Sequence, residues 1–381
     1  GWMKDMPAEA WEKGRSVEIL RNNIFMDKQE SFVAAMDSTG RFSVRVPLVN
    51  TSEIYIDIGR KGINTVVEPG ETYFLLHDFS TGHVLFMGED VRLQNELQTH
   101  PPLYVDGYLR KGQGTVDEFR IQMEEKYRHA VEELSRRVEE HPNLSRRYRY
   151  YMESFALTGL GRSMMQARFV VPDWQLPEDY VDFVRTKVWQ RPSKPYTLCQ
   201  NFGILMRDYI GHFSEAKDKA RGNAVFNAFK RLRQQGEISM TEEEANTVEA
   251  YQLAVRELQE KLNAEPSDSL RQRMVVELGK SELSQRFMSL VTRFEDVLNE
   301  EILIDNIDFW KEDAESVGCD SILCQIHLAR KLYGLIDNMR KPLPDRMMAK
   351  AEWGIRLEGG WDIVSREQEK YVSIQNRDLS D

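Results

Sequence analysis

The hydrophobic pattern of the chain changes its period once, between Val66 and Leu97, and this change limits the fold more than any other feature. Before it, short segments rich in β-branched and aromatic residues alternate apolar with polar positions, which is the pattern of half-buried strands. After it, apolar residues recur every three or four positions, which is the pattern of amphipathic helices. The sequence therefore predicts strands first and helices later, without the alternation of a doubly wound fold.

Turn chemistry marks the end of the strand region. The segment Glu68–Glu71 reads as a tight turn, because its Pro presets φ and its Gly tolerates a positive φ. We expect an aromatic strand at Thr72–Leu76 and a further strand at Val84–Phe86 that ends before Gly88. Asp90 is then the expected N-cap of the first helix. The chain thus passes from strand to helix almost directly, with no Gly/Ser-rich or Pro-rich tether.

Five earlier segments also read as strands, and Arg41–Val46 alternates most strictly. We expect a small antiparallel β-sandwich over residues 1–95, with Gly40 in the left-handed conformation and a turn at Gly59–Gly62. The predicted strands are Ser16–Phe25, Ser31–Met36, Arg41–Val46, Ile54–Ile58 and Ile63–Val67, and the predicted inward side chains are Phe42, Val44, Ile54, Ile56 and Phe74.

Residues 96–381 predict a mostly α-helical domain, so the expected fold class is α+β with two domains. No repeat of fixed period is visible, which argues against a solenoid. Thr241 and Glu244 form a capping-box pattern. Expected helices cover Val116–Val138, a segment from Tyr151 that ends near Gly159–Gly161, Glu178–Trp189, Leu198–Phe213, Thr241–Leu262, Asp268–Leu278, Ser281–Ile304, Asp320–Asp337, Asp345–Leu357 and Trp361–Ile374.

Charge and composition exclude several classes of protein. The chain has 51 Lys and Arg against 62 Asp and Glu, a net charge of −11, which argues against nucleic acid as a partner. The locally basic run Ser145–Tyr151 is interpreted as a solvated helical face. No run of 18 apolar residues occurs, so we expect no membrane-spanning segment. Three cysteines are too few for a disulfide-built scaffold.

Cys319, Cys324 and His327 form the sharpest constellation for chemistry. Cys324 and His327 are three residues apart on a predicted helix, so they share a face and are weak candidates for a metal pair or a nucleophile–base pair. A zinc site needs four ligands, and the sequence has no CxxC or HxxxH pair that could complete one. Buried structural roles are the alternative. We therefore predict no catalytic residue, no metal and no cofactor.

Two other patterns are interpreted as structural. His77-Asp78 ends a predicted strand and lacks the further His and Asp ligands of a metal phosphohydrolase. Glu300, Glu301, Asp305 and Asn306 form an acidic cluster that we place at a helix end, either as a cation site or as a solvated terminus.

Several structural turns together resemble a known family. Gly40-Arg41-Phe42 before an alternating strand, Glu68–Glu71, Phe86-x-Gly88 and Gln94-Asn95-x-Leu97 resemble the N-terminal β-domain of TlpA/ResA-like thiol–disulfide oxidoreductases of the Gram-negative envelope. Leu176–Phe183, Lys341-Pro342-Leu343 and the tail from Glu369 to Asn376 are similar to the region that precedes the thioredoxin domain in that family.

The resemblance implies a periplasmic or extracytoplasmic accessory region that positions a thioredoxin-like domain or recognises its protein or peptide substrate. The family's activity resides in a WCxxC motif, which this sequence does not contain, so whether the parent protein is an enzyme stays open. The alternative is a stand-alone envelope protein that binds a peptide or glycan between its two domains. An enzyme that uses Cys324 and His327 is a third hypothesis.

Overall fold

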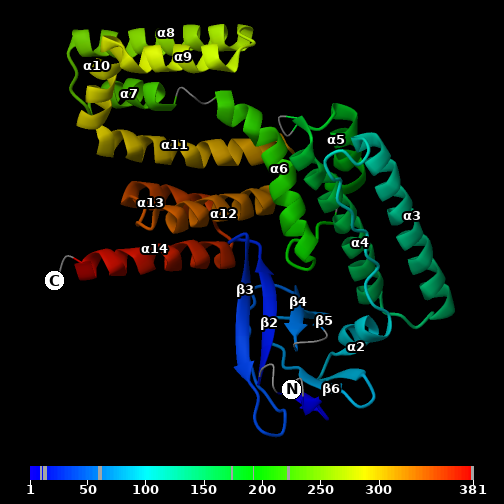
Figure 1. The fold of residues 1–381 in the computed structure, drawn as a ribbon. Coiled ribbons are helices and arrows are strands. Elements are labelled where there is room, and N and C mark those ends of the chain that lie inside the picture. The colour runs from blue at the N-terminus through cyan, green and yellow to red at the C-terminus, as the bar shows by residue number, and fades with distance from the viewer. Residues whose placement is uncertain are drawn as a thin grey trace. The chain divides into compact units, whose positions relative to one another are not determined.

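The structure, a computed structural model, describes residues 1–8, 11, 15–58, 62–172, 175–191, 193–220 and 224–378. The predicted turn at Gly59–Gly62 lies largely outside the described residues. The chain forms two compact units, Gly1–His212 and Phe213–Asp381. Strands come first and helices follow, which confirms the predicted α+β class (Figure 1).

The strands of the first unit form two sheets. The larger sheet has the order β3-β2-β4-β5 and is antiparallel throughout. The smaller sheet has the order β1-β6-β7, in which β1 runs parallel to β6 and β6 antiparallel to β7. The strands are β1 Trp2–Lys4, β2 Ser16–Asn23, β3 Lys28–Ala35, β4 Ser52–Asp57, β5 Gly62–Val67, β6 Phe74–Asp78 and β7 His83–Met87.

One hydrophobic core joins the two sheets. Buried side chains from the larger sheet, such as Ile54 and Ile56, pack with Leu75 and Phe86 of the smaller one. Two of the predicted inward residues, Ile54 and Ile56, are thus confirmed. The prediction that Phe74 points inward is wrong, because Leu75 and His77 are the buried positions of β6.

The predicted strand Arg41–Val46 is wrong as a paired strand. Only Arg41 forms a bridge, to Trp2, and the residues that follow lie outside both sheets. Exposure nevertheless alternates along the segment: Phe42, Val44, Val46 and Leu48 are half-buried against the β core, and the residues between them are exposed. The alternation therefore reports correctly which side chains face the core, although the segment has no ladder partner.

Among the described residues, five α-helices begin in the first unit after the sheets. Asp90 does not cap the first of them; Val91 is the N-cap residue, and Asp90 accepts a hydrogen bond from Arg147. Thr115 and Glu118 cap the second with a reciprocal capping box. The helices are α2 Arg92–Thr99, α3 Val116–Glu140, α4 Arg146–Gln166, α5 Glu178–Val184 and α6 Gln200–Ala220, with a 3₁₀ turn at Ala167–Val170 and a π-helical turn at Arg185–Trp189.

The described part of the second unit is helical. Thr241 and Glu244 form the predicted capping box. The helices are α7 Ala224–Gln235, α8 Glu242–Ala264, α9 Asp268–Lys280, α10 Glu282–Arg293, α11 Glu295–Ser316, α12 Ser321–Met339, α13 Asp345–Gly354 and α14 Glu358–Asp378. Phe226, Phe229, Phe287 and Leu298 belong to one buried cluster that joins α7, α10 and α11.

Three helix predictions need correction. Helix α4 continues through Gly159 and Gly161, because the missing side chains let Val105, Val188 and Leu205 pack closely against it. The predicted helix Ser281–Ile304 is two helices that meet at Phe294, and α7 was not predicted. The basic run Ser145–Tyr151 is only partly solvated, since Tyr148 and Tyr151 are fully buried.

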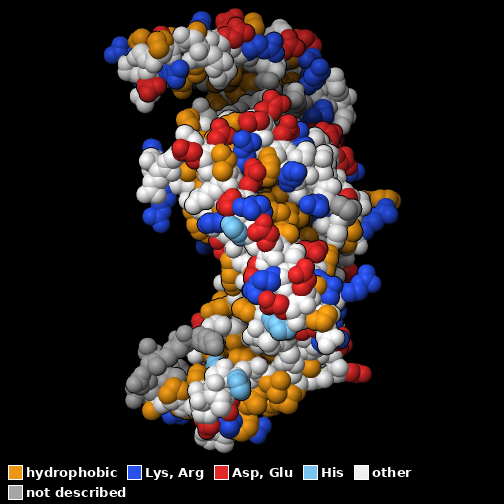
Figure 2. Space-filling view, turned by 90° about the vertical axis from the view of Figure 1, so that its right-hand side faces the viewer, with side chains coloured by type: hydrophobic (Ala, Val, Ile, Leu, Met, Phe, Trp, Pro, Cys, Tyr) orange, Lys and Arg blue, Asp and Glu red, His pale blue; other side chains and the backbone are white. Residues whose placement is uncertain are grey.

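Acidic and basic side chains lie next to one another over the face shown in Figure 2. Helix α3 illustrates the pattern, with ion pairs such as Arg128–Glu132 and Arg136–Glu140 at i,i+4 spacing. No helix among the described residues has the length and hydropathy that a membrane span needs.

Candidate functional site

The structure places Cys324 and His327 on α12 and Cys319 just before it. Cys324 is 7% exposed, and its thiol donates to the carbonyl oxygen of Cys319 over 3.7 Å. Hydrogen bonding with Cys319 lowers the pKa of the Cys324 thiol. Residues 317–320 lie outside the helices, as a disulfide would require, yet no disulfide joins the two cysteines.

His327 is 5% exposed, and burial, with smaller contributions from Lys331 and Arg330, lowers its pKa to about 3. The imidazole is therefore neutral near pH 7 and carries no charge that could hold Cys324 as a thiolate. Within the described residues, no group of three or more His, Cys, Asp or Glu side chains is placed to hold a metal ion. Over the part of the chain that the structure describes, no third His, Cys, Asp or Glu side chain completes a metal site with Cys324 and His327. The metal pair and the nucleophile–base pair therefore stay hypotheses.

The other polar patterns have structural partners. His77 is buried and stacks on Phe79 with ring centroids 4.2 Å apart. Asp78 accepts from the Lys4 ammonium at 2.7 Å, which holds the pKa of the carboxyl well below its usual range. Glu301 and Asp305 lie inside α11, not at a helix end, and Arg231 pairs with both.

A buried carboxyl at Glu53, which the sequence did not single out, joins the larger sheet to the helices of the first unit. Glu53 lies on β4 and is 5% exposed. Its Oε1 accepts from the Tyr151 hydroxyl of α4 at 3.0 Å, and its Oε2 accepts from the backbone N–H of Gln200 at 2.8 Å. One side chain on β4 thus contacts one residue on each of two helices, α4 and α6.

Glu53 also faces the N-terminus of α6, because Gln200 is the first residue of that helix. Unpaired N–H groups and the helix dipole favour a carboxylate at this position. Burial has the larger effect and raises the pKa of Glu53 to about 7, while the bonds from Gln200 and Tyr151 lower it. The carboxyl is therefore poised between its neutral and charged forms near neutral pH.

Backbone and side-chain bonds on both sides of Glu53 extend this contact. The Glu53 N–H donates to the Leu198 carbonyl oxygen at 3.1 Å, and the Thr197 hydroxyl donates to the Thr51 carbonyl oxygen at 2.7 Å. On the neighbouring strand β2, the Asn22 amide donates to the Gln200 side chain at 2.8 Å. We call the contact made by these residues the Glu53 anchor.

A second contact fixes β5 and the following turn. The buried Gln94 side chain of α2 donates to the Val66 carbonyl oxygen at 2.8 Å. Arg147 of α4 reaches back to Asp90 at 2.7 Å and also pairs with Glu68 of the Pro-Gly turn. The first helix after the sheets, α2, is therefore hydrogen-bonded back to β5, and α4 is bonded to the turn that follows β5.

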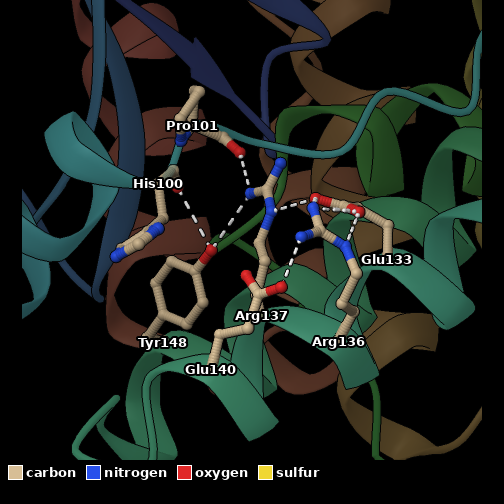
Figure 3. Close-up of polar contacts among 7 residues, drawn as sticks. All are labelled: His100, Pro101, Glu133, Arg136, Arg137, Glu140 and Tyr148. Carbon is tan, nitrogen blue, oxygen red and sulfur yellow. Dashed lines mark hydrogen bonds and ion pairs between the residues drawn. The ribbon is translucent and has the colours of Figure 1, made fainter.

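A polar cluster joins the ends of α2, α3 and α4 to one another (Figure 3). Arg137, in the last turn of α3, donates to the Pro101 carbonyl oxygen at 2.8 Å and to the Tyr148 hydroxyl at 3.3 Å. Tyr148 donates in turn to the His100 carbonyl oxygen at 3.2 Å, and Glu133 holds the Arg137 guanidinium at 2.8 Å. One side chain network thus binds the C-terminal ends of α2 and α3 to the start of α4.

The arrangement is suited to holding parts together more than to chemistry. Glu53, Tyr151 and Cys199 are enclosed between sheet and helices, and burial raises the pKa of both the Tyr151 hydroxyl and the Cys199 thiol well above their usual values. A substrate would need to open this packing to reach them. The sequence hides the anchor because Glu53 alternates in phase with Tyr55 and Asp57, positions that read as solvent-facing.

Comparison with known proteins identifies no relative: no family model, no curated protein and no solved structure matches the chain.

Proposed function

We propose that this chain is a non-catalytic accessory region that holds its β sheets at a fixed place on a helical support, within a thioredoxin-like thiol–disulfide oxidoreductase system of the cell envelope. Its partner is then a thioredoxin-like domain, in the same polypeptide or in another, and its task is to position that domain or to recognise a protein substrate for it. The turns and helices that resemble the TlpA/ResA-like family motivate the redox setting.

The Glu53 anchor is the observation that carries the positioning role. A buried carboxyl is costly unless it is hydrogen-bonded, so a site that keeps one gains a defined geometry between the parts that it joins. Here those parts are β4, α4 and α6. The contacts of Gln94 and Arg147 repeat the junction at β5 and the following turn.

The redox setting is tested by the parent gene and by assay. We expect a thioredoxin-like domain to be encoded after Asp381 in the same gene or in the gene of a partner protein. We expect the present chain alone to leave insulin disulfides unreduced, since it has no CxxC with a lowered thiol pKa. Insulin reduction that survives removal of contaminating thioredoxins and disappears in Cys324→Ala would contradict the non-catalytic assignment. A Cys199→Ala variant serves as the matched control, because that thiol is enclosed and its pKa is raised.

A further inference from the structure

A groove of about 650 Å³ runs through the β region beside the end of β1. One wall is the extended segment Phe42–Leu48, and the other is the chain from Glu68 to Tyr73. Core side chains form its floor, and Gly1 closes one end; the floor residues are Ile54, Ile56, Val67, Leu75 and Phe86. The groove is therefore apolar at its base and bordered by extended backbone on one side.

The wall Phe42–Leu48 is held at both ends and unpaired between them. Gly1 and Phe42 exchange two backbone hydrogen bonds, of 2.7 and 3.1 Å. At the far end, Arg21 of β2 donates to the Pro47 carbonyl oxygen. Within the described residues, the backbone groups of Ser43–Val46 have no hydrogen-bond partner. Such a row of open N–H and C=O groups is a template for another strand.

The pairing of β1 fixes the register that a strand in the groove would adopt. Trp2 bridges Arg41 in antiparallel direction, and the Met3 N–H donates to the Gly40 carbonyl oxygen at 2.8 Å. Antiparallel pairs alternate between hydrogen-bonded and non-bonded residues, and Gly1–Phe42 is a bonded pair. The next bonded positions are therefore Val44 and Val46, opposite the second and the fourth residue on the amino side of Gly1.

The other neighbour of β1 gives the same direction. Trp2 and Met3 lie opposite Leu76 and His77 of β6 in a parallel pair. Continued backward, the same register sets residues before Gly1 opposite Phe74 and Tyr73, and Tyr73 lines the groove. A strand there would lie between Phe42–Leu48 and the residues that lead into β6. Phe42 already pairs with Gly1, and β6 already pairs with β1.

We propose that this groove is the seat of a β-strand that continues β1 on the amino side of Gly1, so that its occupant is polypeptide joined to this chain. The strand forms a ladder with Ser43–Val46, so that the smaller sheet has four strands. The segment Arg41–Val46, which alternates strictly but is unpaired after Phe42, then has a paired neighbour. Its second and fourth residues before Gly1 face the core together with Val44 and Val46, because bonded pairs share a face. The inference is independent of the proposed positioning role. That role rests on the contacts of Glu53 with the helices, whereas the groove is lined by Ile54 and Ile56, which alternate with Glu53 along β4.

The test attaches three leaders of equal length to Gly1 of the whole chain. The in-phase leader, Thr-Val-Lys-Val-Thr, places valines at the second and fourth positions before Gly1. The out-of-phase leader, Val-Thr-Val-Lys-Thr, has the same composition with its valines at the third and fifth, and a Gly/Ser leader forms no strand. Amide hydrogen exchange at Ser43, Val44, Arg45 and Val46 is the measurement.

With the in-phase leader we expect exchange at Val44 and Val46 to slow at least about tenfold relative to the Gly/Ser leader, with a smaller change at Ser43 and Arg45, whose N–H groups point away from the added strand. Equal exchange with all three leaders would overturn the proposal. The in-phase peptide, added free at about 100 µM, should leave both rates unchanged, because a short tether supplies an effective concentration in the mM range. Protection by the free peptide would assign the groove to a separate ligand and would also overturn the proposal.

Discussion

At Glu53, burial and hydrogen bonding act in opposite directions on one carboxyl. Burial raises its pKa to about 7, and the bonds from Gln200 and Tyr151 limit the rise. A folded-state pKa above the unfolded value means that the neutral form is favoured in the native protein. The stability that this provides is complete below the unfolded pKa and is lost as the pH rises through 7.

Glu53→Gln should therefore flatten the pH dependence of stability. Relative to the variant, the wild-type free energy of unfolding should fall by roughly 3 kcal/mol between pH 4.5 and pH 8, since each pKa unit corresponds to about 1.4 kcal/mol. Urea unfolding at several pH values measures this difference. The exposed Glu89 provides the control, because Glu89→Gln should follow the wild-type profile. A difference curve for Glu53→Gln that is flat or rises with pH would show that the carboxyl is charged throughout.

The residue scale is also where the sequence was least informative. Ile54 and Ile56 could be assigned to the core because apolar side chains in an alternating strand have one favourable face. Glu53 could not, because a carboxyl on the opposite face reads as solvent-facing unless the helices that cover it are known. Tyr151 and Gln200 approach from about 100 and 150 residues away, a separation that periodicity does not report.

At the scale of elements, local signals account for most starts and stops. The capping box of Thr241 and Glu244 is predicted correctly, because an N-cap acts within one turn of the helix. Errors arose where tertiary packing decides. Helix α4 passes its glycines because neighbouring side chains fill the space, and Arg41–Val46 has the alternation of a strand without a paired neighbour.

Removing the cap of α8 tests this local reading. Thr241→Ala should lower the free energy of unfolding of the second unit by about 1 kcal/mol, because the hydroxyl accepts from the Glu244 N–H at the exposed start of the helix. Thr292→Ala is the matched control, since Thr292 is exposed on α10 and alanine has the higher helix propensity. Thermal unfolding followed by circular dichroism compares the two. Equal effects of both substitutions would show that the capping box contributes nothing measurable.

At the scale of the whole molecule, the strand region and the first helices belong to one compact unit. The unit Gly1–His212 includes both sheets and the helices α2 to α5, so its limit does not coincide with the predicted domain boundary at residue 95. That boundary stays a prediction about which part can fold alone. The change from strand to helix was visible in the sequence as a change of period; the packing of the sheets on α2, α4 and α6 was not, because it depends on the buried contacts of Glu53 and Gln94.

Limited proteolysis with trypsin tests the fixed junction most directly. Arg92 is exposed at the start of α2, between the last strand and the helices, so a flexible joint would be cut there. Because Gln94, Arg147 and Glu53 tie the sheets to the helices on both sides of this position, we predict that native protein resists cleavage at Arg92 while the unfolded chain is cut at once. Mass spectrometry of the products identifies the sites. Rapid cleavage at Arg92 into two stable fragments, one containing the sheets and one the helices, would contradict a fixed junction and with it the proposed positioning role.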